Sequence, residues 1–140
     1  MVKVEELKEA LRAREILVLE EKKVEQYGGQ LLTKKRFYHI VQLIPHNGVQ
    51  FIVYNCIYVT VADEVPLDLV NKLNLELPLI KVWRHGEEVD TIMFTFYVPI
   101  TSPEEGAEGL LRFEELLKPA IETVEKWELE WCEKNRRGGR

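Results

Sequence analysis

Apolar residues at helical and alternating spacings divide the chain into short elements. Val4, Leu7 and Leu11 recur at helical spacing among charged residues, which predicts an amphipathic helix over residues 3–13. Residues 16–24 begin with a run of consecutive apolar residues, a pattern that fits either a continued helix or a strand. A pair of glycines, Gly28-Gly29, ends the segment in either case.

Two runs rich in β-branched and aromatic residues follow, at residues 30–44 and 49–61. The segment between them contains Asn47-Gly48, a strong signal for a tight turn, so the runs are predicted to form a β-hairpin. Residues 79–84 and 91–100 flank another turn-forming segment, and we expect a second hairpin there.

Two further helices are predicted. Residues 63–77 place Pro66 in a first helical turn and carry leucine and valine at helical spacing until Pro78 ends the helix. Ser102 then opens a long helix as its N-cap, with Glu105 reaching back as in a capping box. This helix runs to about residue 134, and Pro119 is expected to kink it. Its apolar stripe consists of Leu110, Phe113, Leu117, Ile121, Val124 and Trp131.

The predicted order is therefore α-β-β-β-α-β-β-α, which indicates an α+β fold with an antiparallel sheet packed against helices. A chain of 140 residues has the size of one domain, and we expect a single domain over residues 1–134. The basic end, residues 135–140, is expected to be a flexible tail.

The two longest predicted strands differ in how clearly they mark a buried face. In residues 91–100, alternate residues from Ile92 to Val98 are apolar, and we assign this face to the core. In residues 49–61 both faces are largely apolar, so the second face of the sheet needs cover. Two explanations stay open: the N-terminal segment or the long helix covers it, or it is a surface for self-association or for a partner.

Large aromatic residues are enriched at protein–protein surfaces, because they offer a large contact area with a polar or adaptable end. Trp127 and Trp131 lie one turn apart near the end of the long helix, which at about 1.5 Å per residue would be roughly 45 Å long. These two side chains either fold back onto the domain or meet a partner. The residues that we assign to a partner or dimer surface are Tyr54, Tyr58, Trp83, Met93, Tyr97, Trp127 and Trp131.

The formal net charge of −5 understates the acidity of the domain, because four basic residues lie at its end. An acidic body would repel a phosphate backbone, so nucleic-acid binding is not expected. The sequence contains no stretch of about 18 uncharged apolar residues, which a membrane-spanning helix would need. The N-terminus lacks the pattern of a secretory signal. With only two cysteines and no disulfide pattern, we expect a cytoplasmic protein. The excess of glutamate over aspartate is typical of heat-adapted proteins. The basic residues at the end are Lys134, Arg136, Arg137 and Arg140.

The sequence predicts no catalytic site, no metal site and no cofactor. The three histidines have no cysteine or second histidine at ligand spacing. Gly106 and Gly109 are predicted to lie inside the long helix, where they would not cradle a phosphate, and no nucleotide-binding motif occurs. The glutamates stand beside lysine and arginine at helical spacing, as on solvated helices. Cys56 is expected to be a buried, unreactive thiol.

The segments PLDLVNKLN at residues 66–74 and LPLIKVW at residues 77–83, with a strand that ends at Pro99, resemble the YbjN-like family. The resemblance covers about residues 35–132 and includes the long helix that opens with SPEE. It implies a type III secretion chaperone-like fold and dimer formation, and the members are described as bacterial sensory-transduction regulators without defined chemistry. Asn74 matches a recurrent asparagine of the family, for which the resemblance implies a local role in closing the helix end.

The leading hypothesis is a homodimeric, non-enzymatic module of chaperone-like fold that binds or regulates another polypeptide. Sheet edges and apolar surfaces are general sites of peptide recognition, and both are expected here. The alternatives are a structural subunit of a larger assembly and, with different chemistry, a small enzyme that uses carboxylates or Cys56.

Overall fold

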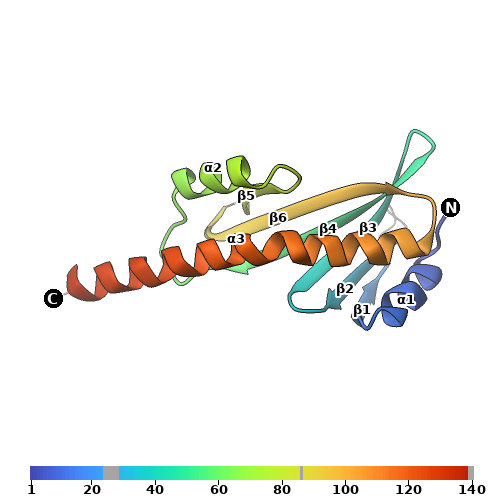
Figure 1. Ribbon diagram of the computed structural model, residues 1–140, viewed down its shortest axis with the longest axis horizontal. Helices are drawn as coiled ribbons and strands as arrows, with labels where there is room; N and C mark the ends of the chain where they lie inside the picture. Colours follow the sequence, from blue (N-terminus) through green and yellow to red (C-terminus); the bar gives the residue numbers. More distant parts are fainter. Residues whose placement is uncertain (24–28, 86, 139–140) are drawn as a thin grey trace. The chain divides into compact units, whose positions relative to one another are not determined.

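The protein has the predicted α+β fold. The computed structural model describes residues 1–23, 29–85 and 87–138. Its strands form a six-stranded antiparallel sheet in the order β1-β2-β3-β4-β6-β5. In chain order (Figure 1) the elements are α1 (Val4–Ala13), β1 (Leu17–Lys22), β2 (Gln30–Lys34), β3 (Tyr38–His46), β4 (Val49–Val59), α2 (Leu67–Glu76), β5 (Lys81–His85), β6 (Glu88–Ile100) and α3 (Pro103–Gly138).

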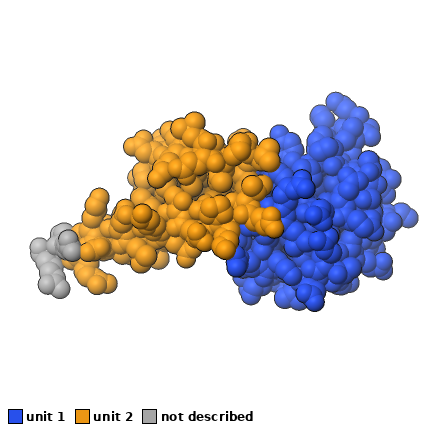
Figure 2. Space-filling model, in the orientation of Figure 1, with its two compact units in different colours: residues 1–56, 95–114 blue, residues 57–94, 115–140 orange. Residues whose placement is uncertain are grey.

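The chain forms two compact units, which Figure 2 shows in different colours. Unit 1 comprises residues 1–56 and 95–114, and unit 2 comprises residues 57–94 and 115–140. The boundaries fall inside β4, β6 and α3, so the chain passes from one unit to the other within regular structure rather than through linkers. The single domain expected from the sequence stays a prediction.

The first helix and the segment after it settle an alternative that the sequence left open. α1 buries Leu7 and Leu11, as their helical spacing predicted. The chain then reverses at Glu15, whose φ of 60° ends the helix, and β1 follows. The ambiguous segment is therefore a strand rather than a continued helix. Gly28, the first of the glycines expected to end it, lies outside the described residues.

The run predicted as one strand over residues 30–44 is two strands, β2 and β3. The turn between them, residues 35–37, is closed by a backbone hydrogen bond of 3.1 Å from its first residue to the carbonyl of its third. Glycine, proline and asparagine usually mark turns, and this one contains none of them. Instead, the carboxylate of Glu114 in α3 accepts hydrogen bonds from the backbone N–H groups of Arg36 and Phe37, at 2.8 and 2.9 Å.

The hairpin between β3 and β4 forms where the sequence predicted it. His46 pairs with Val49, so the turn consists of the two residues Asn47 and Gly48. Both have positive φ, 49° and 77°. A two-residue turn with this backbone has the twist of the strands that it joins, and asparagine and glycine are the residues that adopt it at little cost. The turn therefore fixes the register between the two strands.

The core of unit 1 lies on one face of its sheet, and Tyr54 is at its centre. The ring of Tyr54 stacks with Phe96 of β6 and Phe113 of α3, in both cases with 5.9 Å between ring centroids. Its hydroxyl donates to the carbonyl of Gly106 in α3 at 2.6 Å. Because a buried hydroxyl without a partner would be costly, this bond allows tyrosine to occupy the core.

In unit 2, α2 ends before Pro78 as predicted but begins at Leu67, so Pro66 is its N-cap and not part of its first turn. The side chain of Asn74, expected to close the end of this helix, instead bonds to β5. Its amide nitrogen donates to the carbonyl of Val82 at 2.7 Å, and its amide oxygen accepts from the N–H of the same residue at 2.8 Å. Val82 belongs to β5, an edge strand of the sheet. Asn74 thus occupies backbone groups that an exposed edge would offer to another strand.

The sheet of unit 2 is buried on both faces at residues 91–94 of β6. Ile92 and Phe94 are buried, which confirms the core face predicted for this strand. Thr91 and Met93, which alternate with them, are buried as well. Met93 is therefore a core residue of unit 2, and its assignment to a partner or dimer surface is wrong.

Helix α3 begins as the capping pattern predicted. The N–H of Glu105 donates to the Ser102 hydroxyl at 3.3 Å, and the carboxylate of Glu105 accepts from the hydroxyls of Ser102 and Thr101. Among the apolar residues expected along its stripe, those from Leu110 to Val124 are buried. The helix continues through Pro119 and ends at Gly138, so the described part of the predicted flexible tail is helical.

Candidate functional site

Unit 1 has a sheet face on which apolar side chains are exposed, which we call the open face. Strand pairing sets Ile44 opposite Phe51 and Ile40 opposite Asn55. Thr95 of β6 lies on the same face, because its hydroxyl donates to the side chain of Asn55 at 2.7 Å. All members are at least partly exposed: Leu32, Tyr38, Ile40, Gln42, Ile44, Phe51, Val53, Asn55, Thr95 and Tyr97.

Two tyrosines of the open face are more than half exposed. Tyr97 exposes 62% of its surface and meets Phe51 edge-on, with 6.3 Å between ring centroids. Tyr38 exposes 56%, and the ammonium group of Lys34 lies 4.8 Å from its ring centroid. Exposed apolar residues that form a continuous group, rather than standing singly, mark interaction sites. The open face has this character.

The partner surface that we expected from the sequence is divided by the structure. Tyr97 lies on the open face, whereas Tyr54 is fully buried. Placing Tyr54 on that surface was wrong, because the face of β4 that carries it is the core face. The neighbouring residues Phe51 and Val53 belong to the open face instead. Asn55 alone could not have ranked the two faces in the sequence, because the opposite face carries the polar residues Gln50 and Thr60.

The other residues of that predicted surface lie in unit 2. Tyr58 is half-buried, and burial raises its pKa. The hydrogen bond that its hydroxyl donates to the carboxylate of Glu128 in α3 raises the pKa further. Trp83 exposes 36% of its surface. Trp127 and Trp131 are half-buried. These four positions stay predictions as partner contacts.

A buried polar cluster in unit 1 was not predicted. His39 Nε2 lies 2.6 Å from Glu114 Oε2, and both side chains are almost inaccessible to solvent. Since an ionised carboxylate only accepts hydrogen bonds, Nε2 carries a proton. The other ring nitrogen lies 3.0 Å from the hydroxyl of Thr33. The cluster connects β2, β3 and α3, and 75 sequence positions separate His39 from Glu114.

The electrostatics of this cluster favour an ionised Glu114. Burial by itself would raise its pKa, but hydrogen bonds from His39 and from the backbone of Phe37 and Arg36 outweigh burial and hold the pKa below its ordinary value. Burial raises the pKa of the nearby Cys56 thiol to about 12. A thiol that stays protonated at neutral pH is a poor nucleophile, so Cys56 lends no support to the enzyme alternative.

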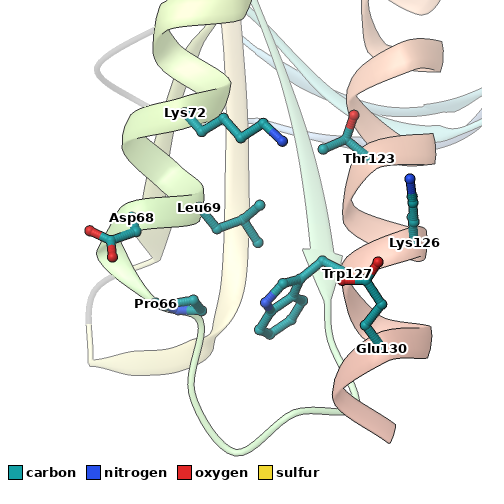
Figure 3. A pocket seen from close by; sticks show the side chains of 8 residues that line it. All are labelled: Pro66, Asp68, Leu69, Lys72, Thr123, Lys126, Trp127 and Glu130. Atoms are coloured by element: carbon teal, nitrogen blue, oxygen red, sulfur yellow. The ribbon is translucent and has the colours of Figure 1, made fainter. Parts of the chain in front are cut away.

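Unit 2 contains a pocket between α2 and α3, with a volume of about 380 Å³ (Figure 3). The indole of Trp127 points from α3 toward Pro66 and Leu69. Lys72 extends from α2 toward α3, and its ammonium group lies at the end of the pocket that Thr123 and Lys126 line. The pocket therefore has an apolar end and a cationic end. The lining residues are Pro66, Asp68, Leu69, Lys72, Thr123, Lys126, Trp127 and Glu130.

Within the part of the chain that the structure describes, no group of three or more His, Cys, Asp or Glu residues is placed to hold a metal ion. In the same residues, no helix is both long enough and apolar enough to cross a membrane.

Comparison with known proteins supports the fold. No protein-family model matches the chain, and no curated protein matches it either. Among solved structures, the crystal structure of YbjN, described as a putative transcription regulator from E. coli, is similar to this chain with a TM-score of 0.57. The match has 13% sequence identity and covers 86% of this chain and 89% of YbjN. The chain therefore has the fold of YbjN, as the sequence resemblance implied.

Proposed function

We propose that the protein is a non-enzymatic binding or regulatory module of the cytoplasm that holds a polypeptide on the open face of unit 1. The observation that carries this proposal is the group of partly exposed apolar residues on that face, which includes Tyr38 and Tyr97. The fold adds support, since YbjN is described as a regulator.

The chemistry of the open face suits the surface of another protein. Its tyrosines and phenylalanine provide apolar area, which contributes about 25 cal/mol per Å² when it is removed from water. Gln42, Asn55 and Thr95 lie among them, and their polar groups give such a contact its direction. A polypeptide that packs on this face would bury the aromatic residues and pair with these polar groups.

A second copy of the chain is the first polypeptide to consider, because two open faces brought together would cover each other without another protein. A closed dimer of this kind uses the same patch on both subunits. We therefore include homodimer formation in the proposal.

Affinity capture from cells of the source organism tests the proposal with matched variants. Tyr97→Ser removes an exposed ring from the open face, and Leu75→Ser removes an apolar side chain that is 86% exposed on α2, outside that face. We expect proteins captured by the wild type to be lost with Tyr97→Ser and kept with Leu75→Ser. Circular dichroism serves as the control for the folded state of both variants.

Equal capture by the wild type and Tyr97→Ser would contradict the proposal. The captured proteins could instead be present in fixed stoichiometry and release the chain only on denaturation. That result would favour the alternative of a structural subunit in a larger assembly.

A further inference from the structure

The pocket between α2 and α3 has the size of a small-molecule site. Its volume of about 380 Å³ falls within the range of roughly 300–1,000 Å³ that ligand pockets occupy. The pocket lies wholly in unit 2, whereas the open face lies in unit 1. A ligand of this pocket would therefore bind at a site separate from the surface of the proposed function.

The apolar end of the pocket suits a flat ring. The Trp127 indole extends into the space between the helices, toward Pro66 and Leu69 (Figure 3). Leu69 is buried and Trp127 is half-buried, so part of the indole remains available for contact. Aromatic rings stack favourably on an indole, and a ring placed here would also contact the leucine and the proline.

The other end of the pocket is cationic. Lys72 extends toward it from α2 (Figure 3), Lys126 lines the pocket from α3, and neither forms an ion pair within residues 1–23, 29–85 and 87–138. The hydroxyl of Thr123 donates to the carbonyl of Pro119 at 3.0 Å, so its oxygen offers only acceptor capacity. The ammonium groups are thus the donors at this end, and they lack a negative partner.

Of the two acidic residues in the lining, Glu130 disfavours a second negative charge on the ligand. Asp68 points away from the cavity, on the outer side of α2 (Figure 3). The carboxylate of Glu130 lies beside Trp127, near the apolar end. A second anionic group at that end would be repelled by Glu130, which disfavours ligands with several charges.

We propose that this pocket binds a small aromatic molecule that carries one carboxylate. The ring stacks on Trp127 and contacts Leu69, and the carboxylate lies between the ammonium groups of Lys72 and Lys126. Because the side chains that contact the ligand come from both α2 and α3, the bound ligand connects the two helices.

The test uses naphthalene-1-acetate as the probe and naphthalene-1-acetamide as its neutral match, with binding followed through the NMR signal of the Trp127 indole N–H. We expect the acid to shift this signal and the amide to bind several-fold more weakly. Lys72→Gln and Lys126→Gln should each weaken binding of the acid about threefold, as expected for an ion pair that solvent reaches. Neither substitution should change binding of the amide. Added salt should weaken binding of the acid and leave binding of the amide unchanged.

Matched variants keep the test specific. Lys118→Gln removes an exposed lysine of α3 that does not line the pocket, and binding of the acid should be unaffected. Trp127→Leu should weaken both probes, with the folded state checked by circular dichroism. Equal binding of acid and amide, an equal loss with Lys118→Gln, or no change at the Trp127 signal would each overturn the proposal. Much tighter binding of a peptide that ends in phenylalanine would also overturn it, because the site would then belong to a polypeptide end.

Discussion

At the scale of single residues, close contacts explain choices that the local sequence alone would not favour. Gly109 lies inside α3, where alanine would be a better helix former. A Cβ atom at this position would meet the phenol of Tyr54, whose ring carbon Cζ lies 3.1 Å from that point. Glycine is required there because the core of unit 1 places a tyrosine against the helix backbone.

Replacing Gly109 by alanine tests this reasoning. Helix propensity alone would stabilise the variant by about 1 kcal/mol, but we expect a net destabilisation of about 1–3 kcal/mol from overpacking against Tyr54. The measurement is the free energy of unfolding in urea. Adding Tyr54→Phe to the variant removes the nearest oxygen and should recover part of the loss. A Gly109→Ala protein more stable than the wild type would show that the ring can move aside freely.

The buried Glu114 gives a residue-scale prediction for pH. Because its pKa is lower in the folded chain than in the unfolded one, its ionised form stabilises the fold above the unfolded value of about 4.3. This contribution is lost as pH falls through the folded pKa. Glu114→Gln should be less stable by about 2 kcal/mol at pH 7, since hydrogen bonds to a charged group are replaced.

Urea unfolding of both proteins from pH 7 to pH 3 checks the sign. The wild type should lose more stability than Glu114→Gln over this range, so the difference between them should shrink in acid. As a matched control, Glu122→Gln changes an exposed glutamate of the same helix and should keep a constant difference from the wild type. A Glu114→Gln difference that does not depend on pH would contradict the role of the charge.

At the scale of elements, two turns of the same sheet are specified in different ways. The turn at Asn47-Gly48 is encoded locally, because both residues adopt positive φ at low cost. The turn at residues 35–37 has no such signal, and the Glu114 carboxylate from α3 holds its backbone. The first turn could be predicted and the second could not, because its stabilising group lies far away in the sequence.

Gly48 provides the matching experiment. Its φ is 77°, and a Cβ atom there would meet no other atom within 4 Å, so any cost of substitution comes from the backbone. We expect Gly48→Ala to lower the free energy of unfolding by about 1 kcal/mol, and Gly48→Asn to cost less because asparagine tolerates this region. Thermal unfolding of the two variants, compared at the same concentration, measures the difference. Equal stability of Gly48→Ala and Gly48→Asn would show that the turn can adopt another backbone conformation.

At the scale of the whole molecule, the exposed apolar surface decides what the chain can associate with. The open face belongs to unit 1, whereas Trp131 belongs to α3 in unit 2 and is half-buried. If self-association uses the open face, these two places should respond differently to substitution.

Sedimentation of Tyr97→Ser and Trp131→Ala over a range of concentrations separates the two surfaces. We expect Tyr97→Ser to raise the dissociation constant of the dimer by about tenfold or more, as for an aromatic residue central to an interface. Trp131→Ala should raise this dissociation constant less, because Trp131 lies in unit 2, outside the open face. A wild type that stays monomeric at high concentration would contradict dimer formation, and stronger dissociation by Trp131→Ala would move the interface to α3.

The sequence by itself determined the elements whose signals are local. The helical spacings, the Asn-Gly turn, the capping residues of α3 and the core face of β6 could all be identified from it, and so could the α+β fold and the likeness to YbjN. Each helical spacing, turn, cap and strand face depends on residues within a few positions of one another, and the fold and the likeness follow from the order of these elements. The position of Gly106 and Gly109 inside a helix, rather than in a loop, belongs to the same class.

Only the tertiary structure decided which face of β4 is buried, because both faces are apolar and alternation cannot rank them. This decision placed Tyr54 in the core and left Phe51 and Tyr97 on the open face. The contact between His39 and Glu114 and the pocket beside Trp127 likewise join residues that are distant in the chain. Such features depend on how elements pack, and packing is a property of the folded chain rather than of any short segment.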